Sequence, residues 1–215
     1  MPVLLLITNY LDPDSFDKLI AAVPKVAYAN KEKLLSIQKN KVPDFKLIQA
    51  ALIVQYCHAL RVSEVLNLTK ENFDFKRNIL TLEKTKTGFK TVNGIKKRKK
   101  QFTSIPPDFP KWVINYIESK NGLLFPFNRQ LIWSYTKKAA IVADLQMGEQ
   151  QEERYIEGAW THLIRKSRAK LMIDLGAKEV LVKVKLRHTF TVTERYTKPD
   201  INGLIKWENE NIREN

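Results

Sequence analysis

The sequence of 215 residues has little cysteine, little glycine and no long apolar run near its N-terminus. Cys57 is the single cysteine, which excludes an internal disulfide and a zinc site built on cysteines. Seven glycines occur, and none lies in a Gly-x-Gly-x-x-Gly or Gly-Lys-Ser/Thr loop, which argues against Rossmann and P-loop nucleotide sites. The apolar run at residues 3–7 is too short for a membrane span and lacks the basic flank of a signal peptide.

Acidic residues are also scarce, because 23 Asp and Glu stand against 37 Lys and Arg, leaving a net charge of +14. Such a surplus resists compaction by self-repulsion, so a polyanionic partner is expected. The excess is concentrated at residues 84–100, with eight basic and no acidic residues, and at 162–198, with ten Lys or Arg and three acids. Nucleic acid is therefore the first candidate. An anionic membrane ranks last, because the basic residues do not flank one strong apolar face.

Apolar residues make up 44% of the chain, enough for a core. Their spacing predicts mostly helices with one small antiparallel sheet, an α+β fold that is mainly α. The sheet is expected from the β-prone segments 79–82 and 102–105, with turns at Thr87-Gly88 and Asn93-Gly94 in a lysine-rich connection. Helices are expected from about residue 11, at 43–58 and 63–68, and near 108–119, 128–145, 160–175, 177–186 and 199–211.

Four short segments combine residue types suited to phosphodiester chemistry. Cleavage without a metal needs a nucleophile, positive charge at the developing phosphorane and an acid for the leaving oxygen. An arginine pair can clamp the non-bridging oxygens bidentately, and a tyrosine of pKa about 10 attacks once its proton is removed or its phenolate is stabilised. The absence of a carboxylate pair argues against two-metal nuclease chemistry. The segments are Ala59–Leu68, Glu83–Lys90, Thr161–Arg165 and Leu186–Thr197.

In this order the segments resemble the tyrosine recombinase, or phage integrase, family. The shared features are Arg in a Leu-Arg-x-Ser-Glu box, Lys in a β-turn, His-x-x-Arg, a second His and then Tyr. The resemblance covers residues 11–200 and implies the family's catalytic-domain fold, a helical bundle with a three-stranded antiparallel sheet. Residues 1–10 are then an N-terminal tail, and residues 201–215 a C-terminal tail with a helix that docks on a neighbouring protomer or on its own core.

The resemblance implies a site-specific DNA recombinase or integrase that needs no metal, ATP or other cofactor. Tyr196 would attack the scissile phosphate and hold the DNA as a 3′-phosphotyrosine, so that rejoining needs no further energy source. Arg61 and Arg165 would stabilise the phosphorane, and Lys86 would protonate the 5′-oxygen, with Lys84 and Lys90 as rivals. His162 would assist proton transfer, His188 would bind a non-bridging oxygen, and Glu64 would orient Arg61 rather than merely pair with it on the helix surface.

The expected partner is double-stranded DNA, engaged by a tetramer of protomers on two duplexes, with no membrane. The expected location is cytoplasmic or nucleoid-associated, in a prokaryotic cell or in the host of a virus. Further DNA contacts are expected from basic residues of the two charged regions, namely Lys84, Lys90, Lys96, Lys97, Arg98, Lys99, Lys100, Lys166, Arg168, Arg187 and Arg195.

Three departures from the family pattern keep alternatives open. Arg187 stands where the family usually has Gly, which adds charge at the phosphate or moves His188. Tyr196 follows His188 one residue sooner than usual, and only about ten residues precede the first expected helix, where most members carry a helical core-binding domain. The chain would then be a minimal recombinase or a part of a longer one. The alternative functions are a type IB topoisomerase, a telomere resolvase and a non-catalytic DNA-binding accessory protein.

Overall fold

The computed structural model describes residues 10–37, 44–83, 89–92, 95–98, 100–145, 153–188 and 201–213. Within these ranges the chain is mainly helical with a small antiparallel sheet, which confirms the predicted α+β class. The helices are α1 (Pro13–Ile37), α2 (Phe45–Cys57), α3 (Val62–Val65), α4 (Lys111–Glu118), α5 (Arg129–Val142), α6 (Glu153–Asp174), α7 (Glu179–Leu186) and α8 (Ile201–Asn211). The strands are β1 (Phe73–Asp74), β2 (Ile79–Glu83), β3 (Phe89–Val92), β4 (Ile95–Arg98) and β5 (Lys100–Ser104).

The sheet contains three strands in the order β1-β2-β5, with antiparallel pairing throughout. Strands β2 and β5 pair from Ile79 opposite Ser104 to Glu83 opposite Lys100. Strand β1 was not predicted from the sequence, because two residues are too few to show an alternating pattern. Strands β3 and β4 form a separate antiparallel pair in the lysine-rich connection, with Lys90 opposite Lys97.

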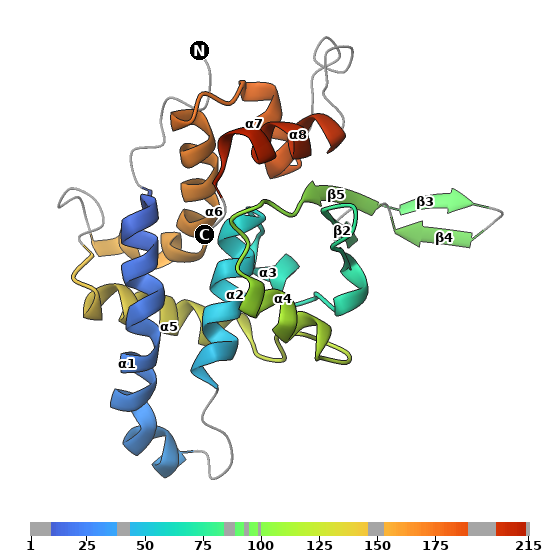
Figure 1. Cartoon of the computed structure of the whole chain (residues 1–215). Helices are drawn as coiled ribbons and strands as arrows, with labels where there is room; N and C mark the ends of the chain where they lie inside the picture. Colours follow the sequence, from blue (N-terminus) through green and yellow to red (C-terminus); the bar gives the residue numbers. More distant parts are fainter. Residues whose placement is uncertain are drawn as a thin grey trace.

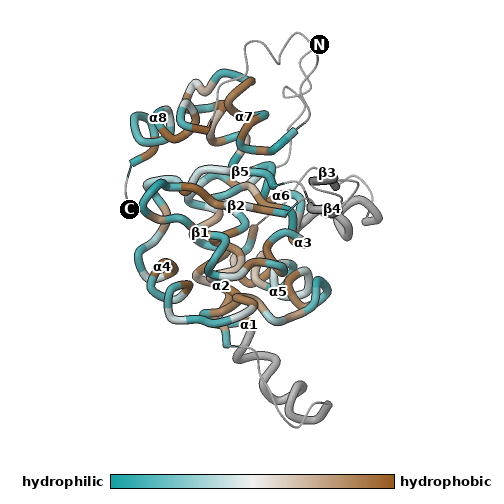
Figure 2. The backbone as a smooth tube through the Cα atoms, turned by 90° about the vertical axis from the view of Figure 1, so that its right-hand side faces the viewer, coloured by the Kyte–Doolittle hydropathy of each residue, from teal (hydrophilic) through white to brown (hydrophobic). Residues whose placement is uncertain are grey.

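The sheet lies between two groups of helices, as Figures 1 and 2 show. Helices α7 and α8 cover one side, and α1, α2, α4 and α5 lie on the other. Helix α2 occupies the interior: residues 50–57 are all buried, and its tube in Figure 2 is largely brown. A helix that is apolar on nearly every face can only be stable when other elements surround it.

Two apolar clusters form the core. The larger one joins α1, α2, α4 and α5 with the sheet and the first half of the described part of α6, through Leu163 and Ile164. The smaller one joins the second half of α6 to α7 and α8, through Met172, Val182 and Leu204. Helix α6 therefore links both clusters, and residues near its middle are held from both sides.

Local capping explains where several helices begin. The Asp12 carboxylate accepts a hydrogen bond from the Ser15 backbone N–H at 2.8 Å, and Pro13 supplies a first-turn residue that needs no hydrogen-bond partner. Asp44 and Asn128 cap α2 and α5 in the same way. Two helices are longer than the apolar pattern predicted: α1 continues past Pro24 to Ile37, and α6 begins at Glu153 rather than near residue 160.

Helix α8 packs against α7 and β5 of its own chain. Leu204 is fully buried in the smaller cluster, and Ile201 and Trp207 pack on its edge. Docking of this helix on a second protomer stays a prediction. In the part of the chain that the structure describes, no helix has the length and apolar character needed to cross a bilayer.

Candidate active site

The site begins at the turn between α2 and α3. Ala59 adopts a left-handed backbone conformation with φ of 49°, which turns the chain so that Arg61 starts α3. The Glu64 carboxylate accepts hydrogen bonds from the Arg61 backbone N–H at 2.7 Å and from its guanidinium at 3.0 Å. These contacts fix Arg61 at both ends, while 44% of its side chain stays exposed to solvent. Arg61 is therefore ordered and still open to an anionic ligand.

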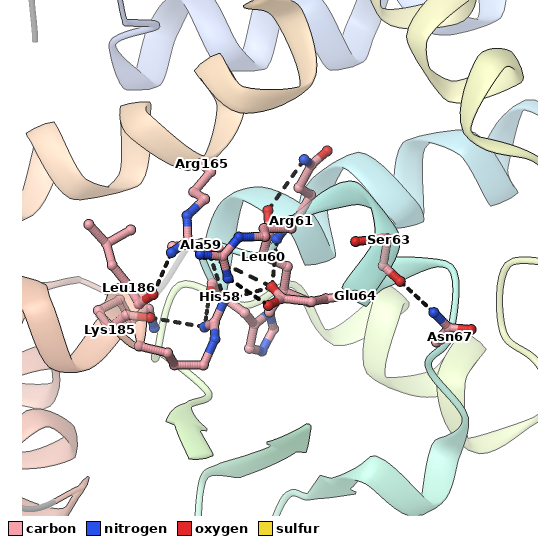
Figure 3. Close-up of polar contacts among 12 residues, drawn as sticks. His58, Ala59, Leu60, Arg61, Ser63, Glu64, Asn67, Arg165, Lys185 and Leu186 are labelled. Atoms are coloured by element: carbon pink, nitrogen blue, oxygen red, sulfur yellow. Dashed lines mark hydrogen bonds and ion pairs between the residues drawn. The ribbon is translucent and has the colours of Figure 1, made fainter. Parts of the chain in front are cut away.

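Arg165 reaches the same place from α6. Its two terminal nitrogens donate hydrogen bonds to the backbone oxygens of Ala59 and Leu186, as Figure 3 shows. Its Nη1 also lies 3.9 Å from Glu64 Oε2. Burial, together with the charges of Arg187 and Arg61, lowers the pKa of Arg165 to about 9, so the guanidinium is still charged at neutral pH. The carbonyl oxygens thus hold a positive charge in place without neutralising it.

Arg187 completes the cluster from the end of α7. This residue has φ of 54°, a left-handed conformation that glycine adopts more readily than other residues, and its side chain turns inward. Its Nη2 donates to Glu64 Oε2 at 2.8 Å and to Ala59 O at 3.0 Å, and its Nη1 donates to Lys185 O at 2.9 Å. Glu64 is thereby surrounded by three guanidinium groups. Burial would raise the pKa of Glu64, but these charges and the Arg61 N–H lower it below its usual value.

The two histidines lie at the exposed edge of this cluster, His162 on α6 and His188 immediately after α7. Burial lowers the pKa of both imidazoles below the ordinary 6.5, and the positive charges of Arg165 and Arg61 lower it further. Both rings are therefore neutral at pH 7 and can accept a proton. A phosphate placed between them would raise both pKa values, because an anion favours the charged imidazole.

The structure thus brings together Arg61, Glu64, Arg165, His162 and His188, which the sequence grouped by motif order alone. Lys84, Lys86, Lys99, Arg195 and Tyr196 lie outside the described residues. Lys90, Lys96, Lys97 and Arg98 lie on β3 and β4, and the structure describes their backbone only. Lys100 and Lys166 are exposed, as a contact with DNA requires.

Two of the expected DNA contacts need correction. Arg168 is fully buried, and its guanidinium forms an ion pair with Asp108 at 2.5 and 3.0 Å. The Arg187 side chain is only 2% exposed and is bound to Glu64 and to backbone oxygens. Both side chains turn inward because largely buried carboxylates from distant parts of the sequence satisfy their charge. Neither is available to a phosphate at the surface.

The structure contains a buried ionic cluster that was not predicted from the sequence. Lys185 on α7 lies 2.8 Å from the Glu208 carboxylate on α8 and also donates to Ser104 on β5. Arg168 lies 3.8 Å from the same carboxylate. One signal was present in the sequence: Glu208 stands four residues after Leu204 and four before Ile212, in the middle of a buried stripe. An acid at such a position needs a buried cation.

Solved structures define the fold class. The catalytic domain of bacteriophage HP1 integrase has a TM-score of 0.52 at 18% identity, over 94% of this chain and 90% of that chain. A XerH site-specific recombinase bound to a palindromic difH substrate, in a post-cleavage complex, has a TM-score of 0.55 at 14% identity. That match covers 96% of this chain and 52% of the XerH chain. The fold is that of an integrase catalytic domain.

The sequence comparison then gives the family. Residues 10–202 match the phage integrase family, and the chain belongs to it. The chain is also 24% identical over 210 residues to the tyrosine recombinase XerD of Vibrio cholerae. That match covers 90% of this chain and 63% of XerD, so the chain spans less than two thirds of the relative's length.

Proposed function

We propose that this chain cleaves and rejoins DNA at a specific site through a 3′-phosphotyrosine on Tyr196. The observation that carries the proposal is the cluster of Arg61 and Arg165 around one carboxylate, with His162 and His188 at its edge. Such a cluster is suited to a pentavalent phosphate, whose oxygens carry more negative charge than those of the ground state. The similarity to XerD and to a DNA-bound XerH supports DNA as the substrate.

The proposed mechanism assigns one task to each group. Arg61 and Arg165 bind the non-bridging oxygens, and their fixed hydrogen bonds mean that little reorganisation is needed as charge develops. His162 is neutral and accepts the phenol proton, while His188 holds a non-bridging oxygen. Lys86 donates a proton to the leaving 5′-oxygen. The phosphotyrosine retains the energy of the cleaved bond, so a 5′-hydroxyl can reverse the step without ATP.

The test uses a pool of nicked duplexes with a randomised central sequence, because the target site is unidentified. Cleavage next to the nick releases a short oligonucleotide and traps the protein on the DNA. We expect wild type to form an adduct that resists denaturing detergent, Tyr196→Phe to form none, and the control Tyr10→Phe to behave as wild type. Sequencing the trapped DNA then yields a defined duplex for rate measurements.

The outcomes separate the alternatives. An adduct with Tyr196→Phe contradicts the assigned nucleophile. Salt-sensitive binding of the pool by wild type without any adduct contradicts the proposal and favours a DNA-binding accessory protein. An adduct combined with plasmid relaxation, but without joining to a second duplex, favours a topoisomerase.

A further inference from the structure

Arg187 contacts the partners of both phosphate-binding arginines. Its Nη2 donates to Glu64 Oε2, the atom that also accepts the Arg61 N–H, while the other carboxylate oxygen holds the Arg61 guanidinium. The same nitrogen donates to Ala59 O, which also accepts from Arg165. Figure 3 shows Ala59 next to Arg165 and Glu64 next to Arg61, with dashed lines marking their polar contacts. One side chain therefore supports the local geometry of two others.

Arg187 also joins two elements that are distant in sequence. Its Nη1 donates to His58 O at 3.2 Å in the α2–α3 turn and to Lys185 O at 2.9 Å at the end of α7. The α7 end carries Leu186, whose backbone oxygen accepts from Arg165, and His188 follows directly. The turn that starts α3 and the end of α7 are thus fixed to each other at the site itself.

Arg187 also offsets the negative charge of Glu64 at the site. Glu64 carries one negative charge next to Arg61, and that charge opposes the attraction of a phosphate to Arg61. Arg187 supplies a buried positive charge 2.8 Å from the same carboxylate. The two charges largely offset each other, so the charges of Arg61 and Arg165 remain effective toward an anion.

We propose that Arg187 is a positioning residue for DNA cleavage, which holds Glu64 and the Ala59 carbonyl so that Arg61 and Arg165 keep a fixed, charged geometry. The inference rests on the proposed function, because it concerns the same reaction. The Arg187 side chain is 2% exposed and both of its terminal nitrogens are bound to Glu64 or to backbone oxygens, so it acts on the site through these partners. Fold stability alone does not require an arginine here, because φ of 54° is more easily adopted by glycine.

The test compares wild type, Arg187→Gly, Arg187→Lys and the control Lys183→Ala, a cation on α7 whose ammonium forms an ion pair with Glu179. The single-turnover rate of adduct formation is measured on a duplex recovered from the pool. The Kd for the same duplex is measured in a Tyr196→Phe background, and unfolding is followed by circular dichroism.

We expect Arg187→Gly to remain folded, to bind the duplex with little change in Kd, and to cleave about 10- to 100-fold more slowly. Added guanidinium ion restores part of the rate, and Arg187→Lys is intermediate, because an ammonium reaches one partner but cannot bridge several. Arg187→Gly cleaving at the wild-type rate overturns the proposal. If Arg187→Gly does not fold, a folded Arg187→Lys with an unchanged rate overturns it.

A second measurement keeps this inference separate from the proposed function. The Nε–H signals of Arg61 and Arg165 in ¹⁵N NMR spectra report the position of both side chains without any cleavage. We expect both signals to shift in Arg187→Gly and to stay in place in Lys183→Ala. Unchanged signals overturn the positioning role, whereas a wild-type protein that forms no adduct contradicts the proposed function alone.

Discussion

At the scale of single residues, we expect the planar, two-pronged shape of the Arg165 guanidinium to matter for cleavage as much as its charge. Two terminal nitrogens bind two carbonyl oxygens on different elements, and a lysine ammonium cannot reproduce that arrangement. We expect Arg165→Lys to lower the single-turnover rate of adduct formation by about 10²-fold, with a smaller change in Kd. The neighbouring exposed residue provides the control, Lys166→Arg. An unchanged rate in Arg165→Lys would show that charge alone suffices.

His58 gives a prediction about pH. The ring is fully buried between Phe73 and Phe109, and its Nδ1 lies 3.0 Å from Val54 O. Burial and the charge of Lys185 hold its pKa well below 6.5. Below pH 6.5 the unfolded chain therefore binds a proton that the folded chain does not, so the free energy of unfolding decreases as the pH falls.

We expect wild type to lose about 2 kcal/mol more stability between pH 7 and pH 5 than His58→Asn, whose amide can donate to the same carbonyl. Urea unfolding of both proteins at the two pH values measures the difference. Parallel losses in the two proteins would mean that His58 titrates normally in the folded state.

The described site residues could be grouped from the sequence because each stands in a short motif and the motifs follow the order typical of the family. Their catalytic roles stay predictions. The inward turn of Arg187 could not be predicted, because it depends on a left-handed backbone and on Glu64, 123 residues away. The burial of Arg168 was missed for the same reason, since Asp108 and Glu208 come from distant elements. A lysine or arginine in a basic stretch is predicted to lie at the surface. Only the folded structure shows which carboxylates from distant elements pair with it.

At the scale of elements, the position of α8 depends on one buried carboxylate. Removing Glu208 leaves Lys185 buried without its carboxylate partner, which typically costs about 3–5 kcal/mol. We expect Glu208→Ala to lower the free energy of unfolding by that amount, measured in urea. Glu210→Ala serves as the control on the same helix, because its pair with Lys206 is exposed at 3.9 Å and contributes little. Equal effects of the two substitutions would contradict the buried pair.

Long helices with a regular apolar pattern were predicted more completely than short elements. Helices with a cap and a sustained apolar pattern, such as α2 and α5, were predicted nearly to their ends. Strand β1 and the first turns of α6 were missed, because two residues show no alternation and Gly158 weakens the local helical pattern. Periodicity therefore identified the long elements and not the short connections between them.

At the scale of the whole molecule, the net charge of +14 predicts strongly salt-dependent DNA binding. The run Lys96–Lys100 holds five cations, of which residues 96–98 lie on β4 and Lys100 begins β5. If each contacts a phosphate, replacing all five by alanine reduces the slope of log K against log salt by about 4–5 units. Fluorescence anisotropy at several salt concentrations measures the slope. Lys206→Ala, an exposed cation on α8, should leave it unchanged, and an unaltered slope in the fivefold variant would remove this run from the interface.

The central claim is a covalent bond between Tyr196 and DNA, and mass spectrometry of the trapped adduct tests it most directly. Digestion with nuclease and trypsin should leave a nucleotide on the peptide of residues 196–206, because trypsin cleaves after Arg195 and Lys206 but not before Pro199. We expect the added mass of the nucleotide to lie on Tyr196. A nucleotide on any other residue, or a wild-type protein that binds the duplex and carries none, would contradict it.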